Sequence, residues 1–239
     1  MIEPESSGLK PRPAATVLLV RESPLEVLMV RRKAATVFAS AWVFPGGLID
    51  REDASEAWLP YVTGADALEP SERANRIGVL RELYEETGVF QGAGNGTARH
   101  LEFFERVQRE HATVSLESLT PFGHWITPEG EGRRFDTWFY LCRALPGAEA
   151  KSDGEETVDA AWVRPEDMIA RAEGGDSSIM FPTHLNLKRL SESSTIDAAL
   201  AAARAREPFT VLPRIEHREE GKFVVIPAEA GYYLTERRF

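Results

Sequence analysis

The sequence predicts a single α/β domain that ends in a C-terminal extension. Strand-like and helix-like segments are mixed along one length of 239 residues, and no linker-like stretch interrupts the middle of the chain. A hydrophobic content of 43% and a charged content of 28% are those of an ordinary globular protein. A chain of this length buries ~70–75% of its unfolded surface, so it needs no disulfide to fold.

Six segments in the main domain have the apolar patterns of strands. They are Ala15–Arg21, Glu26–Arg31, Trp42–Phe44, Gly123–Thr127, Phe135–Arg143 and Thr157–Val163. The turn Glu22-Ser23-Pro24 separates the first two strands, and Pro45-Gly46-Gly47 ends the third. Two further strands, Phe209–Arg214 and Lys222–Ile226, are expected in the tail.

Four segments are expected to be helical. Ser71 is the candidate N-cap of a helix that runs to about Thr87, and Gly88 stands at the expected C′ position. The other three are a stretch near Ala98–Gln108, a short helix that opens at Pro165 and a helix from His184 to about Arg206.

The chain is expected to have three parts. Residues 1–13 are predicted to be a flexible arm, residues 14–190 the main domain, and residues 191–239 an extension packed on that domain. Within the main domain, residues from about 50 to 70 are expected to be an insertion. From Asp50 to Arg73 there are seven acids against two bases, which predicts that the insertion is solvated.

The net charge of −10, from 28 basic and 38 acidic residues, argues against a nucleic-acid polymer as partner. A small phosphorylated ligand remains compatible with it, because the local charge decides and a divalent cation reverses it. No apolar run approaches the ~18 residues of a membrane span, so no membrane partner is expected. The acidic start Met1–Glu5 lacks the order of a signal peptide, which favours a cytoplasmic location.

The single cysteine, Cys142, excludes an intrachain disulfide and a zinc site built on several thiolates. It lies within an apolar run, so a buried, inert thiol is expected rather than a nucleophile. Trp125, Trp138 and Trp162 are expected in the core, and no chemistry is assigned to the five histidines.

The segment from Arg81 to Val89 concentrates acidic residues on one side of the predicted helix. Glu82, Glu85 and Glu86 fall within an arc of about 100°, opposite an apolar stripe. Each like-charge pair at this spacing costs ~0.2–0.5 kcal/mol. Two interpretations stay open: a solvated acidic face, or a site for Mg²⁺ or Mn²⁺, which prefer carboxylate oxygens. Paired glycines Gly46-Gly47 after a strand allow close backbone approach and favour the second.

Arg81–Val89 and the preceding Phe44-Pro45-Gly46-Gly47 resemble the signature of the Nudix hydrolases. In that family the box glycine usually stands 14 residues before the arginine, whereas Gly47 precedes Arg81 by 34. The first box glutamate would then fall near Arg73, where the neighbouring Glu72 is the acid available to replace it. The match covers about residues 14–190.

Flanking segments resemble the branch typified by the peroxisomal coenzyme A diphosphatases. They are Asp53 and Trp58 in the insertion, Trp125–Pro128 and Arg133–Thr137. The family resemblance implies an α/β/α sandwich with a mixed central sheet, an insertion within the Nudix box and a C-terminal extension. Many relatives are dimers, so a homodimer is left open.

The resemblance also implies metal-dependent hydrolysis of a diphosphate that joins a nucleoside to another group, with Mg²⁺ or Mn²⁺ as cofactor. The branch points to coenzyme A or acyl-coenzyme A, which would give 3′,5′-ADP and (acyl-)4′-phosphopantetheine. One alternative is an ADP-ribose, nucleotide-sugar or dinucleotide pyrophosphatase. Another is a non-catalytic module that binds a nucleotide.

Residue roles follow from the resemblance position by position. The implied metal ligands are the carbonyl of Gly46 and the side chains of Glu82, Glu85 and Glu86. Arg81 would orient the glutamates. The general base is Glu82, Glu155 or Glu156, and for the loop pair a solvated charge is an equal alternative. Arg133 and Arg134 would bind phosphate or lie in an exposed turn, and Asp136 would orient a neighbour or cap a strand.

Overall fold

The computed structural model describes residues 9–22, 24–33, 40–94 and 101–238. A nine-stranded mixed sheet lies at its centre, in the order β11-β3-β2-β1-β9-β8-β12, with β4 paired to β1 and β10 paired to β2. Its strands are β1 (Arg12–Arg21), β2 (Glu26–Arg32), β3 (Ala41–Val43), β4 (Gly46–Leu48), β8 (Thr120–Ile126), β9 (Phe135–Arg143), β10 (Thr157–Val163), β11 (Ser178–Ile179) and β12 (Thr210–Val211).

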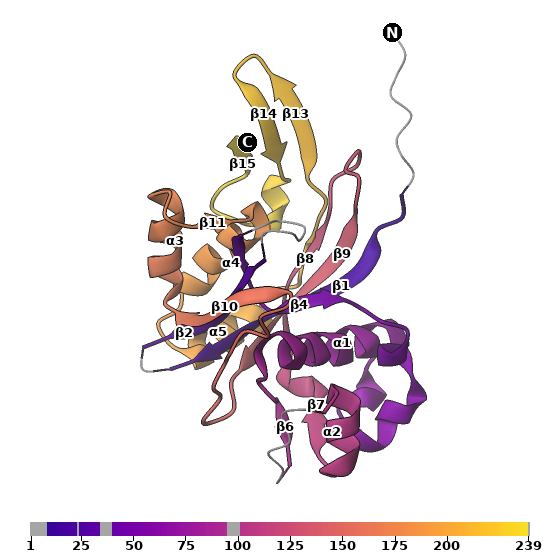
Figure 1. Cartoon of the computed structure of the whole chain (residues 1–239). Coiled ribbons are helices and arrows are strands. Elements are labelled where there is room, and N and C mark those ends of the chain that lie inside the picture. The colour runs from indigo at the N-terminus through magenta and orange to yellow at the C-terminus, as the bar shows by residue number, and fades with distance from the viewer. Residues whose placement is uncertain (1–8, 23, 34–39, 95–100, 239) are drawn as a thin grey trace.

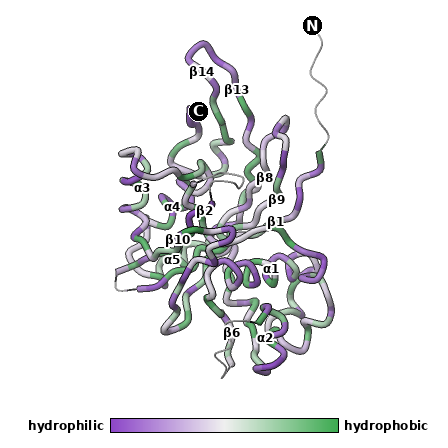
Figure 2. Tube along the Cα trace, viewed as in Figure 1, coloured by the Kyte–Doolittle hydropathy of each residue, from purple (hydrophilic) through white to green (hydrophobic). Residues whose placement is uncertain are grey.

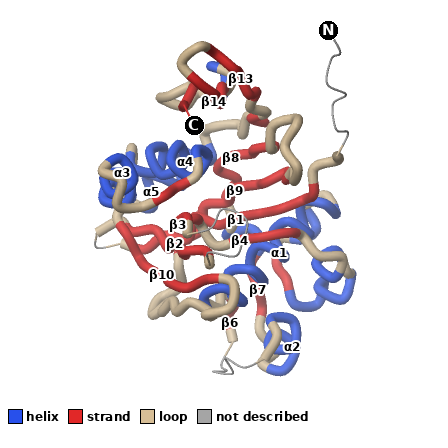
Figure 3. The backbone as a smooth tube through the Cα atoms, turned by 45° about the horizontal axis from the view of Figure 1, so that its top comes forward, coloured by secondary structure: helices blue, strands red, loops and turns tan. Residues whose placement is uncertain are grey.

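Helices cover both faces of this sheet, as Figures 1 and 3 show. Helices α1 (Pro70–Thr87) and α2 (Phe103–Arg109) lie on one side. Helices α3 (Pro165–Glu173), α4 (Phe181–Ser191) and α5 (Ile196–Arg204) lie on the other. The predicted α/β/α sandwich with a mixed sheet is therefore confirmed.

Side chains of strand β1 pack into the hydrophobic cores on both faces of the sheet, so this strand is central. Val17 and Leu19 pack toward α1, whereas Leu18 and Val20 pack toward α4 and α5, and all four are buried. β1 runs parallel to β9 and antiparallel to β2 and β4. Its first half therefore places β4 beside α1, where the site lies.

Helix α1 begins at Pro70, and its N-cap is Glu69 rather than the expected Ser71. Proline is favoured at the first helical position because its missing N–H would have no partner there. The end at Thr87 agrees with the prediction, and Gly88 follows in the left-handed conformation with φ 68°. α2 starts at Phe103; part of the predicted segment near Ala98–Gln108 lies outside the described residues.

The predicted insertion is mostly exposed, but Asp53, Trp58 and Ala65 within it are buried. The segment forms three 3₁₀ turns, at Glu52–Ala54, Glu56–Tyr61 and Ala65–Ala67, and the strand β5 (Val62–Thr63). β5 joins β6 (Gly92–Ala93) and β7 (Thr113–Ser115) in a small sheet. Trp58 is buried because it packs on Phe103 and Phe104, with ring centroids at 5.5 and 4.4 Å.

The single helix expected from His184 to Arg206 is wrong. Two helices occupy this stretch, because the chain turns between them and Thr195 caps α5 by accepting a hydrogen bond from the Ala198 N–H at 3.2 Å. The expected strand Phe209–Arg214 is divided into β12 and the start of β13 (Arg214–Arg218) around Pro213.

Strands β13, β14 (Gly221–Val225) and β15 (Glu236–Arg238) form a sheet that stands above the domain in Figure 1, and its hairpin tip is hydrophilic in Figure 2. Partly buried polar contacts attach this tail to β8 and α4. Tyr232 accepts a hydrogen bond from the Trp125 indole at 3.1 Å and donates one to Asn186 at 2.9 Å. The guanidinium of Arg189 lies 3.5 Å from the Tyr232 ring centroid.

Strand β1 starts at Arg12, so residues 12 and 13 belong to the sheet rather than to an arm. Residues 1–8 lie outside the described residues. None of the helices in the described ranges is long and apolar enough to cross a membrane.

Candidate active site on helix α1

The glutamates of α1 face the Gly-Gly segment of β4. The N–H of Gly46 donates a hydrogen bond to Glu86 Oε2 at 3.0 Å. A Cβ at Gly47 would lie 2.5 Å from the Glu82 carboxyl, and a Cβ at Gly46 would lie 2.3 Å from the carbonyl oxygen of Ala15. Gly46 also has φ 148°, which side chains disfavour. Gly47 is therefore required for α1 to approach β4, and Gly46 is required for β4 to approach β1.

The register of β4 determines where the peptide groups of Gly46 point. Val17 N–H donates to the Pro45 carbonyl and Ile49 N–H to the Pro13 carbonyl, so odd-numbered residues of β4 bond to β1. Gly46 lies between these hydrogen-bonded positions, and its peptide groups are directed away from β1. The carbonyl of Gly46 is thus on the edge of β4 that Glu86 borders.

Arg81 organises the acidic face. Its Nε and one terminal nitrogen donate to the two carboxylate oxygens of Asp53, each at 2.9 Å. The other terminal nitrogen donates to Glu82 at 3.0 Å and to Glu85 at 2.8 Å. A further bond to the carbonyl of Leu48, at 3.0 Å, ties the guanidinium to β4. The charge of Arg81 is shared by three carboxylates; its contacts to Glu82 and Glu85 agree with the expected orienting role, whereas the pair with Asp53 was not expected.

Asp53 was not assigned a role from the sequence. Its side chain is 1% exposed and sits over Gly78, where any Cβ would approach the carboxylate to 2.7 Å. It stands six residues after Gly47, which is the family's spacing from the box glycine to the first box glutamate. Counting forward from the glycine would have found it, because the extra residues follow Asp53 rather than precede it.

The expected replacement at Glu72 is therefore wrong. Glu72 accepts hydrogen bonds from the buried Arg76 at 2.6 and 3.2 Å. That guanidinium also donates to the carbonyls of Leu116 and Leu119, at 2.6 and 2.8 Å. The Glu72–Arg76 pair thus stabilises the packing of α1 against the segment before β8 and lies outside the Arg81 cluster.

Burial raises the pKa of the glutamates nearest β4. The pKa of Glu82 rises to about 7, although Arg81 opposes the shift. The pKa of Glu86 rises to about 8 despite its bond to Gly46, and burial also raises the pKa of Glu85. Desolvation disfavours the charged forms, and a bound cation would favour them.

The donor set of this site suits a hard cation. Glu86 Oε1 is buried and has no hydrogen-bond partner in the described chain. The Gly46 carbonyl lies at the same edge, and the oxygen chemistry is that preferred by Mg²⁺ and Mn²⁺. In the described residues no group of three His, Cys, Asp or Glu side chains already surrounds one point, and Arg81 holds Glu85. The oxygen donors suit such a cation in kind, and in this structure Arg81 keeps the carboxylate of Glu85 apart from those of Glu82 and Glu86.

The loop before β10 brings one of its two glutamates toward α1. Asp153 accepts hydrogen bonds from the N–H groups of Glu155, Glu156 and Thr157, and from the Thr157 hydroxyl, at 2.8 to 3.2 Å. The charge of Glu156 contributes to the raised pKa of both Glu82 and Glu86. Glu155 and Glu156 are both exposed on this turn.

The structure places Arg133 and Arg134 away from this cluster, in the loop between β8 and β9. Arg134 donates to the carbonyls of Thr127 and Leu9, both at 3.1 Å, so it joins the loop to the N-terminal segment. Arg133 is exposed beside it. On β1, Arg12 pairs with Phe135, the residue after Arg134, and Thr16 pairs with Gly46. These two positions on β1 are four residues apart, which is ~13 Å at the rise of a strand.

Other candidate residues have structural partners. Cys142 is buried, and burial raises the pKa of its thiol, so the predicted inert thiol is confirmed. Asp136 contacts His124 Nε2 at 2.5 Å. His124 stacks on Trp138 with centroids 4.2 Å apart, and Trp138 is half-buried rather than fully buried.

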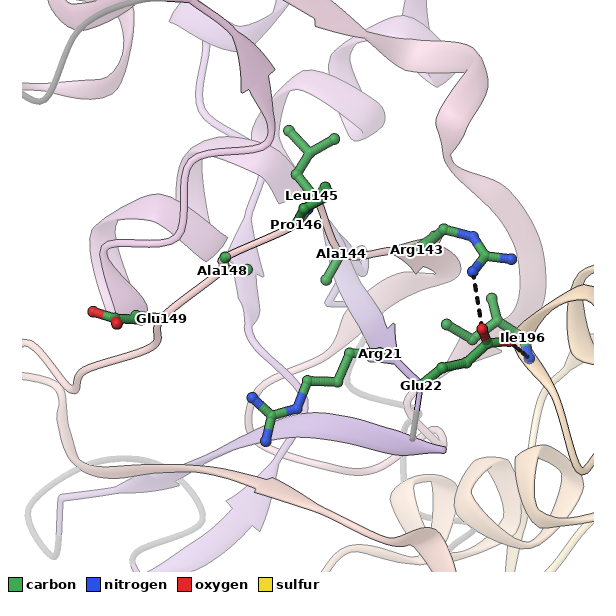
Figure 4. A pocket seen from close by; sticks show the side chains of 10 residues that line it. Arg21, Glu22, Arg143, Ala144, Leu145, Pro146, Ala148, Glu149 and Ile196 are labelled. Atoms are coloured by element: carbon green, nitrogen blue, oxygen red, sulfur yellow. Dashed lines mark hydrogen bonds and ion pairs between the residues drawn. The ribbon is translucent and has the colours of Figure 1, made fainter. Parts of the chain in front are cut away.

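A surface pocket of about 460 Å³ lies at the end of the parallel pair β1 and β9 (Figure 4). Its charged groups are paired: Arg143 contacts Glu22 at 3.6 Å and Asp197 at 2.5 Å, and Arg21 contacts Glu26 at 2.6 Å. These pairs leave little net charge for an anionic ligand, and the glutamates of α1 do not line this pocket. We therefore place the active site at α1 and β4.

Comparisons with known proteins agree with this architecture. The family described as the NUDIX domain matches residues 10–181, well over half of the chain. The crystal structure of a NUDIX hydrolase from Alicyclobacillus acidocaldarius superposes with a TM-score of 0.71 at 26% identity, covering 82% of this chain and 97% of that one.

Two relatives carry the name acyl-coenzyme A diphosphatase NUDT19. The protein of Gallus gallus is 27% identical over 263 residues, covering 78% of this chain and 69% of that protein. The protein of Xenopus laevis is 24% identical over 235 residues, covering 73% of this chain and 62% of that protein. Fold and matches together define a hydrolase that acts on acid anhydrides. The chain belongs to the Nudix family and is a Nudix hydrolase.

Proposed function

We propose that the chain hydrolyses the diphosphate of coenzyme A or acyl-coenzyme A, giving 3′,5′-ADP and (acyl-)4′-phosphopantetheine. The reaction class follows from the family, and the substrate is supported by the names of the two relatives and by the flanking segments Trp125–Pro128 and Arg133–Thr137. The observation that carries the site assignment is the buried, unpartnered Glu86 Oε1 beside Gly46.

Glu82, Glu85, Glu86 and the Gly46 carbonyl would hold Mg²⁺ or Mn²⁺. When bound, the cation neutralises the diphosphate and polarises the attacked phosphorus. Arg81, held by Asp53, orients Glu82 and Glu85.

Hydrolysis adds one water to the phosphoanhydride. The water oxygen bonds to phosphorus, the bridging P–O bond breaks, and the water proton passes to a carboxylate base. We propose Glu156 as that base because its charge reaches Glu82 and Glu86 from the opposing loop, with Glu82 as the alternative. Glu155 on the same turn, and Arg133 and Arg134 beyond the sheet, are not needed for this step.

A substrate panel tests the proposal. Coenzyme A, an acyl-coenzyme A, ADP-ribose, NADH and diadenosine polyphosphates are incubated with Mg²⁺ or Mn²⁺, and the products are separated by chromatography. Release of 3′,5′-ADP from the coenzyme A substrates is the expected result. Cleavage of ADP-ribose without cleavage of the coenzyme A substrates would favour the alternative of a nucleotide-sugar or dinucleotide pyrophosphatase. Tight binding without cleavage of any compound would indicate a non-catalytic nucleotide-binding module.

A further inference from the structure

Arg32, the last residue of β2, lies on the sheet face that carries the glutamates. It pairs in register with Thr157 of β10, and directly opposite residues project on the same face. The hydroxyl of Thr157 donates to the main-chain carbonyl of Glu86 at 3.3 Å, so this is the face covered by α1. The charge of Arg32 acts on Glu86, where it opposes the larger effect of burial on the pKa.

The guanidinium of Arg32 has donors to spare. Its Nε is buried and has no hydrogen-bond partner in the part of the chain that the structure describes. A terminal nitrogen lies 3.7 Å from Glu156 Oε2, which is an ion pair beyond hydrogen-bonding distance. Its side chain is 22% exposed, so one side of the group still reaches solvent.

Arg81, the other cation beside these glutamates, differs in this respect. Its donors are already used by Asp53, Glu82, Glu85 and the Leu48 carbonyl. An anionic diphosphate that approaches Glu82 and Glu86 meets like charge, and Arg32 offers it a planar fork of N–H groups that matches phosphate oxygens.

We propose that Arg32 binds a phosphoryl oxygen of the substrate's diphosphate next to Glu86. This inference rests on the proposed function and assigns to Arg32 the phosphate contact that the sequence pattern favoured for Arg133 and Arg134. The chemistry recognised is a diphosphate, irrespective of the group attached to it.

The test measures binding of ADP in Ca²⁺ by equilibrium dialysis, which separates recognition from turnover. Arg32→Ala should weaken ADP binding by about 10- to 100-fold, the value of a charge-assisted hydrogen bond. Arg32→Lys should fall between Arg32→Ala and the wild type, because it keeps the charge and loses the fork. The matched control is Arg31→Ala. Arg31 pairs with Asp159 at 3.7 Å and its side chain projects from the other face, so its loss should change ADP affinity by less than about twofold.

A second background separates phosphate binding from an indirect effect through Glu156. In Glu156→Gln the ion pair is absent, so Arg32→Ala should still weaken ADP binding if Arg32 contacts phosphate. Loss of the Arg32 effect in that background, or equal affinity of Arg32→Ala and wild type, would overturn the proposal. Thermal melting verifies that each variant is folded. If Arg32→Ala is not folded, the ADP affinity of Arg32→Lys is compared with that of the wild type instead. Wild-type ADP binding that depends on Arg32 without cleavage of any diphosphate would support this inference while contradicting the proposed function.

Discussion

Asp53 and Arg81 form a two-point ion pair across 28 residues of sequence, with both bonds at 2.9 Å. The carboxylate is 1% exposed and the guanidinium side chain 14% exposed. The pair connects the insertion to the glutamate face of α1, because the same guanidinium holds Glu82 and Glu85. The insertion is therefore part of the site's construction.

Removing this pair should lower both stability and activity. Asp53→Asn leaves the buried Arg81 without its main partner, and we expect a loss of about 2–3 kcal/mol in the free energy of unfolding, measured with urea. Diphosphate hydrolysis should fall by about tenfold or more, because Arg81 no longer orients the glutamates. The control is Asp50→Asn. Asp50 is 58% exposed and lies 3.5 Å from Arg81, so its change should stay within about 0.5 kcal/mol. Equal unfolding free energies for Asp53→Asn and wild type would contradict this role.

The close approach of Gly47 to Glu82 makes a second prediction. Gly47→Ala places a methyl group 2.5 Å from the carboxyl, so Glu82 must move. A displacement of about 1 Å in a catalytic group costs on the order of 10²-fold in rate, which hydrolysis assays would detect. Gly132→Ala is the control, because an added methyl there meets nothing within 4 Å. Activity retained in Gly47→Ala would show that the position of Glu82 is not critical.

The raised pKa values predict how stability of the metal-free protein depends on pH. In the folded state Glu82 and Glu86 keep protons up to about pH 7 and 8, whereas the unfolded chain loses them near 4.5. The folded state binds more protons in this window, so the free energy of unfolding falls as pH rises from about 4.5 to about 8. In EDTA, the free energy of unfolding of Glu86→Gln should fall over this pH range by about 2–4 kcal/mol less than that of the wild type. Parallel urea profiles for wild type and variant would refute the assignment.

Metal binding should release protons from the same carboxyls. Near pH 7 Glu86 is largely protonated and Glu82 about half protonated, and a cation binds their charged forms. The calorimetric enthalpy of Mn²⁺ binding should therefore change with the ionisation enthalpy of the buffer, with about one proton or more released. The same enthalpy in PIPES and in Tris would contradict the raised pKa values.

The α/β class and the glutamate face could be predicted because they depend on local patterns, whereas the layers were implied by the family resemblance. Phe135–Arg143 and Thr157–Val163 agree with β9 and β10 residue for residue, since a continuous apolar run marks each of them. The burial of Asp53 and Trp58 could not be predicted from a segment rich in acids, because it arises from distant partners on α1 and α2. Glu156 and Arg32 approach Glu86 through the β2–β10 register, which local patterns do not reveal.

The most direct test of the metal site combines Mn²⁺ calorimetry with hydrolysis of coenzyme A in the same preparations of wild type and Glu86→Gln. Buried Glu86 with its unpartnered oxygen predicts that the wild type binds Mn²⁺ and turns over substrate, and that the variant loses both together. Absence of Mn²⁺ binding to the wild type, or undiminished turnover by Glu86→Gln, would contradict the role assigned to the glutamate face of α1.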